Sequence, residues 1–279
     1  AAANGIKTDP FTFFLLFFYS NIIGLNPGLA GLAIFIALCV DAITDPLMGT
    51  ISDRTNSKYG RRHPYMMISF IPMSLGYILL FAPRQDWDMS QNDLFVWMTL
   101  FTVLTRIGMT LFDIPHRAFG GEVTKDYEER TLLMSWREMI GWVAGLSNAF
   151  LGYGIFFAST PEYPQGQLNP DAWFPFALTG AVFMIATVLY SSFSTKDDIK
   201  GLSKWNGNIS LNEILSELKI AVTNKAFLIF FFGNLFLSLA WGLANTLTLF
   251  VNTYFWEFEA TQIKYFLPFY LIGTLLAFY

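Results

Sequence analysis

Two aspartates stand four residues apart inside a long apolar stretch. Asp41 and Asp45 follow residues 29–40, in which every side chain is apolar or small. An i, i+4 spacing puts both carboxylates on one face of a helix. Carboxylates are costly inside a bilayer and normally face a bundle interior or an aqueous cavity. Hard cations such as Na⁺ prefer oxygen ligands, and a carboxylate can also take up H⁺. This face therefore predicts a cation site.

A second apolar stretch, residues 93–116, carries Arg106, Thr110 and Asp113. Their i, i+4, i+7 spacing keeps them within roughly a 60° sector of a helix. Arg137 and Glu138 add charges on a third helix. Several intramembrane charges of both signs predict a polar cavity in which they pair with one another. The alternative is a set of ion pairs that only fixes helix packing, with Arg106 holding its helix against the aspartate helix.

Composition places these residues in a membrane protein. Hydrophobic residues make up 54% of the 279 residues, charged residues 14%, and the mean hydropathy is +0.44. A soluble domain has roughly 45–50% and about 25% of these classes. With about 20 residues for each span, roughly seven or eight transmembrane helices fit. We predict an all-α membrane protein embedded in the lipid bilayer.

Several function classes are excluded. The net charge of −4 argues against a nucleic-acid partner. The sequence has no Gly-Lys-Ser/Thr phosphate loop, so the chain carries no motif for ATP-driven transport. His63 and His116 lack the spacing of zinc ligands, and Cys39 has no cysteine partner. We expect that the protein is not an enzyme, that it needs no cofactor, and that it binds no metal except a possible Na⁺ at Asp41 and Asp45.

The hydrophobic pattern predicts eight helices. They cover residues 5–24, 29–51, 63–83, 93–116, 136–157, 173–193, 226–253 and from 260 onward. A charged loop is expected over residues 117–135. Residues 1–193 form a six-helix bundle, residues 194–225 a polar linker, and residues 226–279 the first two helices of a truncated second bundle. The linker is predicted to contain a short amphipathic helix near residues 210–218, which begins with capping-box spacing. We expect a fragment cut at both ends.

Basic residues predict the orientation. The loops after the second and fourth helices and the linker after the sixth hold 13 of the 17 lysines and arginines. The opposite loops hold Arg84 and Lys264. These three basic segments are therefore predicted to be cytoplasmic, in an inner (plasma) membrane protein.

The basic loop resembles a known transporter motif. Gly-Thr-Ile-Ser-Asp-Arg at residues 49–54, followed by Gly-Arg-Arg at 60–62, resembles the loop motif of the major facilitator superfamily. Residues 41–60 as a whole are similar to the glycoside–pentoside–hexuronide:cation symporters, the family of melibiose permease. So are Asp-Ile-Pro at 113–115 and the charged stretch 122–131 with Arg137 beyond it.

The resemblance implies a major facilitator fold and three groups of functional residues. The coupling-cation site is implied at Asp41, Asp45 and Thr110, with Thr44 beside them in place of the family's Asn. Solute ligands are implied at Asp113 and Arg137, to which the sequence adds the cationic Arg106 and Lys7. Gating is implied at Gly49, Asp53, Arg54, Gly60 and Arg61.

The sequence departs from the galactoside carriers of this family. The first-helix acid that contacts galactosides is absent near Gly5, unless Asp9 substitutes for it. Arg106 replaces a small residue and Arg117 replaces an aromatic one. These differences favour a small-molecule solute other than a galactoside.

We therefore expect a secondary transporter that couples a glycoside or related sugar to Na⁺ or H⁺ by alternating access. A same-fold carrier of an amphipathic anion or a lysolipid is the first alternative, favoured by Arg106 and Lys7. A membrane sensor or scaffold that does not transport is the second, and the retained acid pair argues against it.

Overall fold

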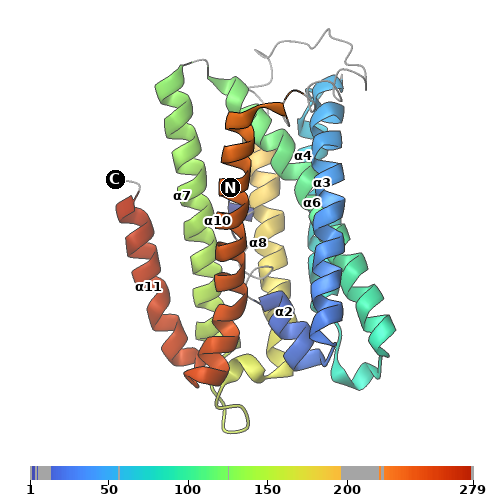
Figure 1. Cartoon of the computed structure of the whole chain (residues 1–279), viewed down its shortest axis with the longest axis vertical. Coiled ribbons are helices and arrows are strands. Elements are labelled where there is room, and N and C mark those ends of the chain that lie inside the picture. The colour runs from blue at the N-terminus through green and yellow to red at the C-terminus, as the bar shows by residue number, and fades with distance from the viewer. Residues whose placement is uncertain are drawn as a thin grey trace.

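The computed structural model describes residues 2–3, 5, 14–55, 57–124, 126–195, 220 and 223–277. Within these ranges the chain forms helices and no β-strand, and the long helices run side by side along one axis (Figure 1). Six of the described helices are long and apolar enough to cross a membrane. The predicted all-α membrane class is confirmed.

The long helices match most of the predicted segments. Their bounds are α2 (Leu15–Phe17) continuing as η2 (Phe18–Ile23), α3 (Pro27–Arg54), α4 (His63–Ile68), α5 (Phe70–Leu80), α6 (Gln91–Val123), α7 (Tyr127–Leu151) continuing as η4 (Gly152–Phe156), α8 (Trp173–Ser194), α10 (Lys225–Phe250) continuing as η8 (Val251–Phe255), and α11 (Ala260–Ala277). Short 3₁₀ turns are η3 (Gln85–Trp87), η5 (Gly166–Leu168) and η6 (Pro170–Ala172). Lys7 and the amphipathic helix expected near residues 210–218 lie outside the described residues.

Local sequence signals set several helix ends. Gly24 adopts φ 86° and ends η2, a left-handed conformation that glycine takes without strain. The Asn26 side chain then caps α3 by accepting a hydrogen bond from Gly28 N at 2.8 Å, with Pro27 in the first turn. Ser90 and Asp93 form a reciprocal capping box at the start of α6.

The predicted charged loop over residues 117–135 is wrong. α6 continues to Val123, and α7 begins at Tyr127, so only Thr124–Asp126 connects them. Asp126 caps α7 by accepting hydrogen bonds from Glu128 N at 2.9 Å and Glu129 N at 3.0 Å. Charged residues mark where a helix leaves the hydrocarbon, whereas the backbone hydrogen bonds of the helix continue in water.

α6 lies at the centre of the described bundle. It packs against α3, α4 and α5, and α5 packs in turn against α8. The α5–α6 contact is close: a Cβ added to Gly108 would stand 2.4 Å from the Met73 backbone nitrogen. Small residues permit such approach between membrane helices. α3 and α6 run in the same direction, so equivalent turns of the two helices face each other (Figure 1).

An aromatic cluster joins the segment around α2 and η2 to the end of η4 and the start of α8, at the end of the bundle opposite the last turn of α3 (Figure 1). Trp173 is fully buried at its centre. Its ring centroid lies 4.7 Å from that of Phe157, 5.2 Å from that of Phe18 and 5.6 Å from that of Phe14. Tilted and edge-to-face contacts of this kind suit the quadrupoles of the rings. This end is therefore held by apolar packing.

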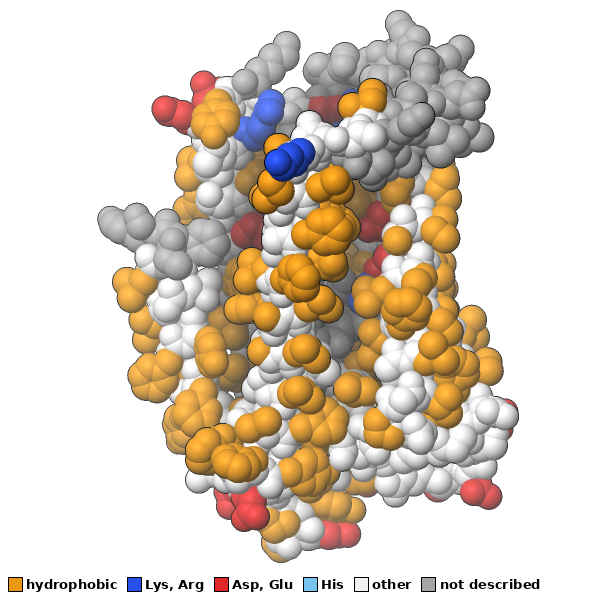
Figure 2. Space-filling model, in the orientation of Figure 1, with side chains coloured by type: hydrophobic (Ala, Val, Ile, Leu, Met, Phe, Trp, Pro, Cys, Tyr) orange, Lys and Arg blue, Asp and Glu red, His pale blue; other side chains and the backbone are white. Residues whose placement is uncertain are grey.

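The surface of α10 is mostly apolar, with a few polar residues such as Asn234 and Asn245. None of its most hydrophobic 18-residue window is buried in the structure. Figure 2 shows hydrophobic side chains along the middle of the visible face and charged side chains towards its two ends. A helix that is hydrophobic all round suits lipid or further helices as neighbours. α11, which follows α10, packs against α7.

Candidate functional site

α3 and α6 bring the two predicted acids together with two of the predicted α6 residues. Arg106 Nη1 donates a hydrogen bond to Asp41 Oδ2 and forms an ion pair with it. One turn further along both helices, Thr110 Oγ1 donates to Asp45 Oδ1 at 2.6 Å. The Asp41 side chain is 21% exposed and the Arg106 side chain 17%. With Thr44, these residues are called the acid-pair site below.

The acid-pair site has spare oxygen atoms. Asp41 Oδ1 and Thr44 Oγ1 are buried and have no hydrogen-bond partner among the described residues. Buried polar atoms in proteins are normally paired, so each such atom calls for an explanation. A cation with oxygen ligands would satisfy both atoms. Nowhere in the described part of the chain do three or more His, Cys, Asp or Glu side chains form a group that could hold a metal ion.

Asp113 lies one turn beyond Thr110 and has a different environment. Its Oδ2 accepts from Arg117 Nε at 2.6 Å, and its Oδ1 accepts from Arg137 Nη2 at 2.7 Å. Arg137 Nη1 also donates to Glu138 Oε1 at 3.2 Å. Two carboxylates and two guanidinium groups thus balance in what is called the Asp113 cluster. Arg137 is 8% exposed, whereas Arg117 is 51% exposed.

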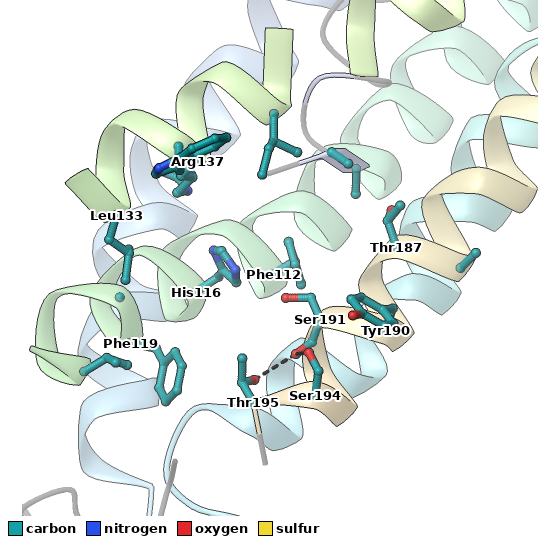
Figure 3. A pocket seen from close by; sticks show the side chains of 17 residues that line it. Phe112, His116, Phe119, Leu133, Arg137, Thr187, Tyr190, Ser191, Ser194 and Thr195 are labelled. Carbon is teal, nitrogen blue, oxygen red and sulfur yellow. Dashed lines mark hydrogen bonds between the residues drawn. The ribbon is translucent and has the colours of Figure 1, made fainter. Parts of the chain in front are cut away.

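A cavity of about 660 Å³ adjoins the Asp113 cluster between α6, α7 and α8 (Figure 3). Phe112, Phe119 and Tyr190 give it an aromatic wall. Arg137 and His116 add polar atoms: Arg137 Nε and His116 Nδ1 are buried and have no hydrogen-bond partner in the described ranges. The arrangement offers an apolar space with nitrogen atoms at one side, which suits an amphipathic molecule.

A third group of charges lies at the basic end of α3 and α6. Arg62 Nη2 donates to Asp53 Oδ1 at 2.6 Å, and Arg62 Nη1 lies 2.7 Å from Glu122 Oε2. Arg61 also pairs with Glu122. These four residues, called the latch below, tie the end of α3 and the following loop to the end of α6. Arg62 is 6% exposed, whereas Asp53 is 43% exposed.

The other predicted gating residues, Gly49, Arg54 and Gly60, lie close to latch residues along the chain. Gly60 adopts φ 81°, which favours glycine and turns the chain towards the latch arginines. Gly49 faces α6, where a Cβ would lie 3.8 Å from Ile114 Cγ2. Arg54 is the last residue of α3, where a basic side chain complements the helix dipole.

Sequence reasoning left out two latch residues, Arg62 and Glu122. Signals for both were present: Arg62 directly follows Arg61 in the transporter-like loop, and Glu122 begins the charged stretch 122–131. The loop expected over residues 117–135 separates Glu122 from the α6 face, whereas the structure places Glu122 within α6. Arg117 was noted only as a departure from an aromatic residue, and the structure places it on Asp113.

Membrane-crossing helices packed around ion pairs within the spans define a multi-pass membrane protein. The chain belongs to the MFS/sugar transport protein family, whose model matches residues 1–279. This result confirms the resemblance drawn from residues 41–62 and 113–131, and with it the predicted major facilitator fold.

Curated relatives agree with the family. The inner membrane symporter YicJ of Escherichia coli (strain K12) is 31% identical over 150 residues, covering 54% of this chain and 32% of that protein. The sodium-dependent lysophosphatidylcholine symporter 1-A of Danio rerio is 31% identical over 155 residues, covering 53% and 28%. The isoprimeverose transporter of Lactiplantibacillus pentosus is 23% identical over 189 residues, covering 67% and 38%. The matched stretches span about a third of the length of these relatives.

Proposed function

We propose that the protein is a secondary active transporter that couples a glycoside or related sugar to Na⁺ or H⁺. The observation that carries this proposal is the acid-pair site, where a buried carboxylate oxygen of Asp41 and the buried hydroxyl of Thr44 have no hydrogen-bond partner among the described residues. The family supports transport, and the relatives include a symporter, YicJ, and an isoprimeverose transporter.

In this proposal the three charged groups have different tasks. The cation binds at the acid-pair site, and the solute binds near the midplane between the two bundles, which rock around it. Asp113 would accept hydrogen bonds from solute hydroxyls, and Arg137 would donate them. The latch closes the basic end, because Arg61 and Arg62 tie the α3 loop to Glu122 of α6. Opening at that end requires these ion pairs to separate.

Counterflow in proteoliposomes tests the proposal. The purified protein is given a panel of labelled neutral glycosides under a Na⁺ gradient, a pH gradient or neither. We expect at least one glycoside to be exchanged and to accumulate only when one of the two gradients is imposed. Exchange without accumulation under either gradient would contradict cation coupling, and no exchange of any glycoside would contradict the solute class.

A second candidate, transport of an amphipathic anion or a lysolipid, is favoured by the aromatic cavity beside Arg137. One relative carries lysophosphatidylcholine in its name. The two candidates differ in competition. Lysophosphatidylcholine below its micellar concentration should leave glycoside counterflow unchanged if the first candidate holds. Uptake of the labelled lysolipid, with no glycoside exchange, would favour the second.

For the orientation, we propose that the basic segments lie in the cytoplasm of a cell whose inner membrane holds the protein. The basic segment between the fourth and fifth predicted helices is shorter than expected, because α6 ends at Val123 and α7 begins at Tyr127. Single cysteines replace Lys58 or Gln165 in a Cys39→Ser background. A membrane-impermeant maleimide added to intact cells should label position 165 and not position 58, and the reverse pattern would overturn the orientation.

A further inference from the structure

The acid-pair site holds three charged side chains between two membrane-crossing helices. Asp41 and Asp45 bring two negative charges, and Arg106 brings one positive charge through its ion pair with Asp41. Asp45 accepts a hydrogen bond from Thr110, which adds no charge. The Asp113 cluster, one turn further along α6, is balanced within itself. Counted over the residues that the structure describes, the acid-pair site therefore keeps one net negative charge.

We propose that Arg106 is a fixed internal cation that sets this charge to minus one, so that the site takes one monovalent coupling ion and rejects divalent ions. This inference rests on the proposed function and deepens its cation site. One Na⁺ or one H⁺ neutralises the site, whereas Ca²⁺ would leave an excess positive charge where hydration is poor. Without Arg106 the two carboxylates would together match a divalent ion.

The contacts leave room for Arg106 and an ion together. Arg106 takes Oδ2 of Asp41, while Oδ1 of the same carboxylate stays unpaired among the described residues. The buried Thr44 hydroxyl is on the next turn of α3, together with Asp45. Guanidinium and cation thus have separate oxygen atoms, and the ion does not have to displace the arginine. Arg106 then belongs to the cation site and not to the solute ligands, where sequence reasoning had placed it.

Two other roles for Arg106 predict different behaviour. A solute ligand would change solute affinity when it is replaced and would leave the ion dependence alone. A packing residue would lower stability equally in every salt. A charge-setting residue instead changes which ions bind and how tightly, because removing one positive charge at contact distance strengthens the attraction for every cation.

The test is an ion titration of thermal stability on the purified protein in detergent. Na⁺ or Ca²⁺ replaces choline at constant ionic strength, so that general screening does not change. An ion that binds only the folded protein raises Tm once its concentration exceeds its dissociation constant, and Tm then keeps rising with the logarithm of the concentration. The variants are Arg106→Gln, which removes the charge, Arg106→Lys, which retains it, and Arg84→Gln, which removes an arginine that is 61% exposed in a loop away from the site.

We expect Na⁺ to stabilise the wild type and Ca²⁺ to have no effect on it. In Arg106→Gln, Tm should begin to rise at a Na⁺ concentration about tenfold lower or less, and the variant should gain stabilisation by Ca²⁺. Arg106→Lys and Arg84→Gln should behave as the wild type. An Arg106→Gln protein that folds only when Na⁺ or Ca²⁺ is present would also support the proposal, since the ion then replaces the missing charge.

Three results would overturn the inference. The first is the same Na⁺ dependence in Arg106→Gln and wild type with no response to Ca²⁺, which leaves the proposed transport function standing. The second is an Arg106→Gln protein that fails to fold in every salt while Arg106→Lys folds, which makes the arginine a packing group. The third is a protein that responds to no cation in any variant and transports glycosides without a cation, which also removes the coupling part of the proposed function.

Discussion

The acid-pair site and the Asp113 cluster use the same residue types on the same helix, yet they differ in charge balance. At the acid-pair site, two aspartates lie beside one arginine, which pairs with Asp41, while Asp45 has the Thr110 hydroxyl as its hydrogen-bond donor. At the Asp113 cluster, two arginines serve one aspartate, and Glu138 balances the second arginine. The first site lacks a positive charge and the second does not.

This difference separates two roles that charged side chains can have within a membrane span. A balanced cluster is complete without a ligand, so it can position helices or present hydrogen bonds to a polar solute. An unbalanced site is complete only when a charged ligand arrives. Residue type and helical spacing identify both kinds of site in the sequence, but only the partners of each side chain distinguish them.

The largest effect is expected from removing Asp45, the acid whose hydrogen-bond donor in the structure is the Thr110 hydroxyl. Asp45→Asn should abolish the stabilisation by Na⁺, because Arg106 and Asp41 then balance and the site no longer needs a cation. Asp113→Asn, its matched control on the balanced cluster, should keep a Na⁺-dependent rise in Tm. Na⁺ titrations of Tm check both. A full Na⁺ response in Asp45→Asn would break the distinction between the two sites.

For the free energy of unfolding, the larger loss is expected at the Asp113 cluster. Asp113→Asn leaves the buried Arg137 without its shortest carboxylate contact, and breaking a buried pair in this way costs about 3–5 kcal/mol. Arg117→Gln removes the exposed partner of the same carboxylate, where an ion pair is worth about 0.2–1 kcal/mol. Urea unfolding in detergent, followed by tryptophan fluorescence, compares the two. Equal losses of unfolding free energy in the two variants would show that burial does not determine the strength of these ion pairs.

The smallest effect concerns the neutral partner of Asp45. Thr110→Val keeps the shape of the side chain and removes the 2.6 Å hydrogen bond. We expect a loss of about 1 kcal/mol in stability, and a several-fold weaker Na⁺ response because one oxygen atom near the ion is lost. Thr99→Val is a suitable control, since that hydroxyl bonds only its own helix at Phe95 O. Identical Na⁺ titrations for the two valine variants would remove Thr110 from the cation site.

Much of the fold could be predicted from the sequence, because apolar length and periodicity are local properties. The order of the helices and most of their ends follow from caps and glycines such as Asn26 and Gly24. The error at residues 117–135 has a physical cause: helix formation depends on backbone hydrogen bonds, while hydropathy reports only the surrounding medium. A charged segment can therefore form the backbone hydrogen bonds of a helix even though its hydropathy is too low for the hydrocarbon layer.

The residues of the candidate site were found for the same reason, but their spacing alone did not group them; the grouping of Asp41, Asp45 and Thr110 came from the family resemblance. Spacing placed Asp41 with Asp45 and Arg106 with Thr110 on single helix faces. It could not show that Arg106 meets Asp41 while Arg137 meets Asp113, because those contacts depend on the register between separate helices. The roles assigned to these residues from the family resemblance remain predictions.

The length of α6 has a consequence for how the protein senses its surroundings. Its 33 residues extend for about 50 Å at 1.5 Å per residue, whereas the hydrocarbon layer is about 30 Å thick. A helix of this length extends past the acyl chains, and we expect its charged end, which carries Glu122, to lie at the lipid headgroups. Mobile ions screen charges there over a Debye length of about 8 Å at physiological salt. If the latch gates the proposed transporter, the half-exposed Asp53 contact would couple its opening to the electrolyte and to anionic lipid at that membrane surface.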